Sequence, residues 1–116
     1  MKFIKTFRNN YVINQVHRQK LPVVSQSEVK RYQIHFKGRV QKVGFRLEVC
    51  EMSKRLGLVG YCRNMEDGSV IAELQGEVSK IDYLLNFMKS LKRIKIVEMK
   101  KEEITLRSDE VRVERM

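Results

Sequence analysis

The sequence predicts one α+β domain, and two observations predict it. Segments with the two-residue apolar period of strands come before and after two segments with the helical period, in the order β-α-β-β-α-β with a short extra strand at the C-terminus. The 116 residues suffice for one hydrophobic core but not for two. This order is typical of the ferredoxin-like sandwich, in which two helices cover one face of an antiparallel sheet.

The N-terminal segment differs from the rest in charge. Residues 1–31 hold seven basic side chains and Glu28 as their acid, a net +6, which leaves +4 of the total +10 for residues 32–116. We therefore expect residues 1–30 to be a basic extension that can be disordered, with a linker around Pro22, and residues 31–116 to be the domain. Apolar residues spaced by four leave open whether the extension is functionless or a targeting device.

The first strand and the first helix have clear patterns. Tyr32, Ile34 and Phe36 alternate with polar residues, which is the period of a half-buried strand ending near Gly38. The next segment has apolar residues at helical spacing, namely Phe45, Val49, Met52 and Leu56. Gly57 is the expected C-cap of this helix.

A hairpin and a second helix come next. Asp67-Gly68 is a turn signal between strands at residues 58–64 and 70–75. Ser79 with Asp82 three positions later is a capping signature, and a helical stripe follows at Ile81, Leu84, Leu85, Met88 and Leu91. Residues 94–104 are expected to form a fourth strand, and Val111 with Val113 a short fifth.

Several kinds of site are not indicated. Cys50 and Cys62 lack the spacing of a zinc site or of a disulfide framework, so we expect free buried thiols, no metal and a cytoplasmic protein. No apolar stretch approaches the roughly 20 residues of a membrane-spanning helix. We assign no catalytic role to His35 or to the acids of the Asp67 turn.

The segment between the first strand and the first helix is a candidate anion site. Backbone N-H groups of such a loop converge with the helix N-terminus, where an anion is favoured. Arg46 lies in the first helical turn, where its charge opposes the helix dipole unless an anion is bound. From spacing alone, a phosphate-gripping arginine and an ordinary surface arginine are about equally acceptable.

Two blocks of the sequence resemble the acylphosphatase family. The family signature Gly-x-Val-Gln-Gly-Val-x-Phe-Arg recurs at residues 38–46, and residues 60–70 are similar to the hairpin that carries the family's catalytic asparagine, here Asn64. The resemblance covers about residues 31–114. It implies hydrolysis of a small-molecule acyl phosphate to carboxylate and phosphate, with no metal and no cofactor.

The resemblance also implies the site residues. Arg46 and the loop amides would bind the phosphate, and Asn64 would orient a water molecule for in-line attack on phosphorus. Such a reaction depends on positioning and on stabilising oxygen charge. The expected phosphate-binding loop comprises Arg39, Val40, Gln41, Lys42, Val43, Gly44, Phe45 and Arg46.

Lys42 departs from the family signature, which has glycine there. A glycine in such a loop often adopts a conformation that costs other residues roughly 1–3 kcal/mol. One alternative is therefore a catalytically impaired phosphate-binding domain. The other is a basic RNA-binding ferredoxin-like module, although we do not expect nucleic acid as a partner because the strand aromatics Tyr32 and Phe36 are expected in the core. We expect a monomeric enzyme.

Overall fold

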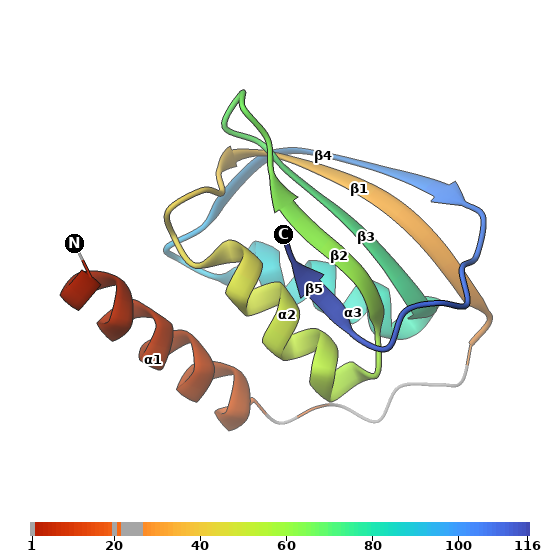
Figure 1. Ribbon diagram of the computed structural model, residues 1–116, viewed down its shortest axis with the longest axis horizontal. Helices are drawn as coiled ribbons and strands as arrows, with labels where there is room; N and C mark the ends of the chain where they lie inside the picture. The colour runs from red at the N-terminus through yellow and green to blue at the C-terminus, as the bar shows by residue number, and fades with distance from the viewer. Residues whose placement is uncertain (1, 20, 22–26) are drawn as a thin grey trace.

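A computed structural model describes residues 2–19, 21 and 27–116 of the chain (Figure 1). The predicted linker at Pro22 lies outside the described residues. The elements are α1 (Lys2–Arg18), β1 (Val29–Arg39), α2 (Phe45–Leu56), β2 (Val59–Asn64), β3 (Val70–Glu77), α3 (Val78–Ser90), β4 (Lys95–Ile104) and β5 (Val113–Arg115). Among the described residues, no helix is long and apolar enough to cross a membrane.

The five strands form one sheet in the order β4-β1-β3-β2-β5. The pairs β1·β3, β1·β4 and β2·β3 are antiparallel, whereas β5 pairs with β2 in parallel. The sheet is therefore mixed, and the predicted antiparallel sheet is wrong at this edge. The reason is geometric, because the connection after β4 reverses the chain before it reaches the opposite edge, where β5 runs in the direction of β2.

One apolar core lies between the helices and the sheet. Alternate strand residues such as Ile34, Cys62 and Ala72 are fully buried and belong to one cluster with the buried faces of α2 and α3. The rings of Phe36 and Phe45 meet edge to face with centroids 4.8 Å apart, so the core contacts the first residue of α2. Gly57 ends α2 with φ 70°, which confirms the predicted C-cap.

The start of α3 differs from the prediction. Its N-cap is Glu77, with no capping bond from that side chain, and the hydroxyl of Ser27 accepts the Ser79 N-H at 2.9 Å. Strand β3 pairs with β1 as far as Glu77, opposite Val29. The helix begins directly after the strand, so Ser79 lies inside the first turn rather than before it.

Helix α1 lies beside α2 (Figure 1). Val12 and Val16, four residues apart on one face of α1, are fully buried. The guanidinium of Arg55 near the end of α2 donates to the carbonyl of Val16. Residues 2–18 therefore form a helix, although the sequence allowed disorder in this segment. The division of the chain at residue 30 stays a prediction.

The other face of the sheet carries a buried arginine. Arg31 is fully buried and donates to Glu73 at 3.0 Å, to Gln75 at 3.2 Å and to Glu110 at 2.5 and 3.2 Å. Burial acts to raise the pKa of Glu73, but hydrogen bonds from Tyr61 and Arg31 outweigh it and the net shift is downward. Arg31 therefore holds the segment before β5 against the sheet.

Candidate active site

The loop between β1 and α2 has the backbone of an anion cradle. Lys42 and Gly44 both lie in the left-handed region, with φ 62° and 79°. No hydrogen bond among the described residues uses the backbone N-H groups of residues 41–44. The first turn of α2 adds N-H groups that have no partner within a helix. The loop thus offers several free donors at a helix N-terminus, where a phosphate is favoured.

Gln41 joins this loop to the β2–β3 hairpin. Its side-chain Nε2 donates to the carbonyl oxygens of Met65 at 2.7 Å and of Ser69 at 2.8 Å. Met65 directly follows Asn64, the last residue of β2. The two sequence blocks that predicted the site are therefore held together by a side chain that belongs to the loop itself.

Arg46 is the second residue of α2 and is partly exposed. Its Nη1 donates to the backbone oxygen of Met116 at 2.6 Å, and the Met116 N-H donates to the carbonyl of Cys62 at 2.9 Å. Burial raises the pKa of the Cys62 thiol, and the nearby charge of Arg46 acts in the opposite direction. Arg46 thus lies near Cys62 of β2, the residue two positions before Asn64.

Asn64 has the exposure that a water-orienting residue needs. It is exposed at the end of β2, where its backbone pairs with Val70 of β3. Cys62, two residues earlier and hence on the same face of the strand, is fully buried. The structure brings the start of α2, the loop and the end of β2 to one end of the sheet.

Ser69 is a supporting residue that the sequence analysis did not identify. Its N-H and hydroxyl approach Asp67 Oδ1 at 3.0 and 2.5 Å, and its hydroxyl lies 2.7 Å from Nε2 of His35. The hydroxyl hydrogen bond from Ser69 lowers the pKa of the Asp67 carboxyl. These contacts of Ser69 with Asp67 and His35 hold the hairpin turn next to Asn64. The Asp-Gly turn signal marks the turn but gives no sign of the contact with β1.

Arg93 is a second residue that the sequence analysis missed. It lies between α3 and β4, and its three guanidinium nitrogens donate to Val43 O at 2.6 Å, Gln15 Oε1 at 3.1 Å and Glu48 Oε1 at 2.8 Å. Burial raises the pKa of Glu48, and the bond from Arg93 opposes that rise. Its partners are 45 to 78 positions away in the sequence, so no local pattern signals it.

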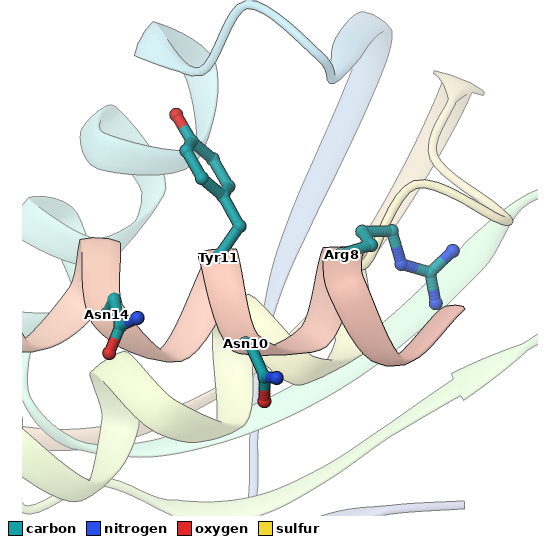
Figure 2. A pocket seen from close by; sticks show the side chains of 4 residues that line it. All are labelled: Arg8, Asn10, Tyr11 and Asn14. Carbon is teal, nitrogen blue, oxygen red and sulfur yellow. The ribbon is translucent and has the colours of Figure 1, made fainter. Parts of the chain in front are cut away.

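A shallow hollow on α1 differs from the loop before α2 in the arrangement of its polar groups. It encloses about 420 Å³ and, among the described residues, is lined by Arg8, Asn10, Tyr11 and Asn14. Figure 2 shows these side chains leaving the helix in different directions rather than converging on a point. The hollow therefore lacks the convergent polar groups of a ligand site. The described residues also contain no group of three or more His, Cys, Asp or Glu side chains that could hold a metal ion.

The fold and the loop define a class: an α+β domain whose first strand is joined to a helix N-terminus by a loop with two left-handed residues. The acylphosphatase family profile matches residues 32–114, and the chain belongs to the acylphosphatase family. This confirms the predicted family and enzyme class.

Individual relatives agree with this assignment. An acylphosphatase from Aliivibrio fischeri is 40% identical over 76 residues, which are 66% of this chain and 84% of that protein. An acylphosphatase from Picrophilus torridus is 34% identical over 77 residues, 66% of this chain and 95% of that protein. The crystal structure of acylphosphatase from Bacillus subtilis superposes with a TM-score of 0.69 at 24% identity, covering 77% of this chain and 99% of that one. That last likeness shows an acylphosphatase-like α+β fold.

Proposed function

We propose that the chain hydrolyses acyl phosphates to a carboxylate and inorganic phosphate, with the phosphate bound by residues 39–46. The observation that carries this proposal is the loop itself. At the start of α2, Arg46 and two left-handed residues lie with backbone N-H groups that have no acceptor in the described part of the chain. Membership of the acylphosphatase family supports the same reaction.

Arg46 and the loop amides would bind the phosphoryl group together. A guanidinium can give two parallel hydrogen bonds to one phosphate, and the amides can take the remaining oxygens. The Nη1 of Arg46 donates to the backbone oxygen of Met116. A phosphoryl group offers several charged oxygens in place of this single acceptor, so it can take two parallel hydrogen bonds from the same guanidinium.

Asn64 would orient the attacking water. Its amide can accept a hydrogen bond from water through the oxygen and donate one to a phosphoryl oxygen through the nitrogen, with no pH-dependent charge. The water would attack phosphorus in line with the leaving carboxylate, which departs as a stable anion. Catalysis would then rest on positioning and on stabilising charge on the phosphoryl oxygens.

Lys42 is compatible with this site. Its φ of 62° is the left-handed conformation in which glycine is favoured, so the lysine bears a cost of about 1–2 kcal/mol. The loop is held on each side of it, because Gln41 bonds the β2–β3 hairpin and Val43 bonds Arg93. The exposed side chain adds a positive charge to the loop.

RNA binding is the less favoured alternative. Sheet modules of that kind stack bases on exposed strand aromatics. Phe36 is 1% exposed in the core, and Tyr32 carries the ammonium of Lys101 over its ring at 4.6 Å. On the opposite face of β1 and β3, Glu73 and Gln75 surround Arg31, so polar side chains rather than aromatic rings occupy that place.

The proposal also covers the arrangement of the helices on the sheet, the oligomeric state and the cellular compartment. We infer a ferredoxin-like arrangement with α2 and α3 on one face of the sheet, supported by their contact with each other and with the same core cluster. We also infer a monomer that works in the cytoplasm without a metal. Two buried free thiols, Cys50 and Cys62, fit a reducing compartment.

The test is release of phosphate from benzoyl phosphate with a chelator present. Arg46→Ala and Asn64→Ala should each lower kcat/KM by about 10²-fold or more, because each removes an interaction with the reacting group. Arg63→Ala, one residue before Asn64 and also exposed, is the matched control and should stay near wild type. A folded wild-type chain that does not exceed spontaneous hydrolysis would rule out the proposed activity.

A further inference from the structure

Arg93 connects three parts of the molecule that are distant in sequence. It contacts the phosphate-binding loop through the Val43 carbonyl at 2.6 Å, α2 through Glu48 at 2.8 Å and α1 through Gln15 at 3.1 Å. Each contact uses a different nitrogen of the guanidinium. Because that group is planar with donors in a fixed fork, the three contacts together set its orientation.

Glu48 is fully buried and holds Arg93 firmly. One of its carboxylate oxygens accepts from Arg93, and the other has no partner among the described residues. Removing the arginine would leave a buried carboxylate without a compensating charge, which is strongly unfavourable. The arginine is therefore confined to a position from which its Nε faces the loop.

The contact with Val43 determines how the next peptide unit is directed. In a trans peptide the carbonyl and the N-H of one unit point in opposite directions. With the Val43 carbonyl turned to Arg93, the N-H of Gly44 must point away from Arg93. This peptide joins Val43 to Gly44, and both neighbours of Val43, Lys42 and Gly44, are left-handed, so its direction is not dictated by regular secondary structure.

Helix α1 lies against the same stretch of the loop. A Cβ placed on Gly44 would come within 3.2 Å of Val12 Cγ2 and 3.4 Å of Arg8 Nε. Val12 is fully buried, and Gln15 on the same helix accepts a bond from Arg93. The N-terminal helix therefore covers the loop on one side while it supports the arginine.

We propose that Arg93 is a positioning residue of the phosphate-binding loop and that α1 supports it through Gln15. The carbonyl of Val43 is held on Arg93 so that the Gly44 N-H is directed to the phosphate. This inference rests on the proposed function, because it assigns a role within that site. It also gives the N-terminal helix a role in the activity.

The experiment measures two quantities on full-length variants: kcat/KM with benzoyl phosphate, and the Kd of inorganic phosphate from the NMR shift of the Gly44 amide. Arg93→Ala should raise the phosphate Kd about tenfold and lower kcat/KM by a similar factor, because it frees the Val43 carbonyl. Arg93→Lys should recover part of the loss, since an ammonium can reach only some of the three acceptors. Gln15→Ala should raise the Kd by a smaller factor.

Arg107→Ala is the matched control, because Arg107 is exposed and its nearest partner is Asp109. It should leave both quantities unchanged. If Arg93→Lys and Gln15→Ala lower the thermal midpoint but keep the wild-type Kd and the Gly44 shift, the role is only structural and the inference is overturned. If the wild type binds phosphate but hydrolyses no acyl phosphate, the proposed function fails and the same Kd series still decides the inference. If it binds no phosphate, both fail.

Discussion

Two arginine clusters, that of the fully buried Arg31 and that of the partly exposed Arg93, lie at opposite ends of the first strand. Arg31 near the start of β1 contacts two carboxylates, those of Glu73 and Glu110. Arg93, at the loop that follows β1, contacts one carboxylate, one backbone carbonyl and one side-chain amide. Eight residues of strand separate the two ends by about 26 Å at about 3.3 Å per residue.

The difference lies in what each arginine holds. Arg31 pairs charge with charge and holds the segment before β5 on the sheet, far from the loop. Arg93 donates one of its three hydrogen bonds to a backbone carbonyl in the loop between β1 and α2. A buried ion pair is weak evidence for net stability because desolvation offsets the attraction. The segment of backbone that each arginine holds is therefore more informative than the ion pair itself. Substitutions at Arg31 should change stability, and substitutions at Arg93 should also change activity.

The largest expected effect is on stability, from Arg31→Met. The variant leaves Glu73 and Glu110 without their shared cation, and breaking a buried pair in this way costs about 3–5 kcal/mol. Urea unfolding should show that loss in the free energy of unfolding. The folded fraction should retain wild-type kcat/KM, and a loss of activity beyond the loss of folded protein would contradict the separation.

The second prediction concerns the pH dependence of the Arg31 cluster. The net pKa of Glu73 is lowered from its ordinary value of 4.5, so its contribution to stability is present above pH 4.5 and is lost as the pH falls through the folded-state pKa. The difference in unfolding free energy between wild type and Glu73→Gln should be constant near neutral pH and shrink below pH 4.5. A difference that does not change with pH would show that the carboxylate charge is not involved.

A smaller effect is expected from Gly44→Ala at the loop. Its φ of 79° disfavours a side chain by about 1–2 kcal/mol, and the new Cβ would press on Val12 and Arg8 of α1. Gly68→Ala is a matched control, with φ 91° and open space around the Cβ. Both variants should lose stability in urea, and only Gly44→Ala should also weaken phosphate binding. Equal phosphate affinities would mean that α1 does not affect the loop.

The smallest effect is expected from Lys42→Gly, which restores the family glycine. Relief of the left-handed strain is worth about 1–2 kcal/mol, and the greater freedom of glycine in the unfolded chain offsets about 0.5–1 kcal/mol of it. The free energy of unfolding should therefore rise by at most about 1.5 kcal/mol, as measured in urea. A clear loss of stability would show that the lysine side chain contributes to the loop.

Local patterns predicted most of the fold, whereas the roles of Arg46 and Asn64 stay predictions. The strand alternation, the Gly57 cap and the loop before α2 depend on neighbours within a few positions, and Arg46 and Asn64 lie in short contiguous blocks. The direction of β5 was not predicted correctly, because Val113–Arg115 is three residues long and its pairing depends on where the preceding connection crosses. The capping of α3 by Ser27 joins positions 52 apart.

The supporting residues of the site could not be predicted for the same reason. Arg93 meets Val43 across 50 positions and Ser69 meets His35 across 34. Neither arginine nor serine carries a local signal for such a contact. The packing of α1 on the loop likewise depends on Val12 and Gly44, which only the folded chain brings together.

Water attack on phosphorus at the loop of residues 39–46 can be tested with ¹⁸O-labelled water. Benzoyl phosphate would be hydrolysed in H₂¹⁸O by the wild-type chain with a chelator present, and both products analysed by mass spectrometry. Enzyme-dependent turnover should place the label in inorganic phosphate, and this labelled product should be lost in Arg46→Ala. Label in benzoate would mean attack on the carbonyl carbon and would contradict the assigned roles of Arg46 and Asn64.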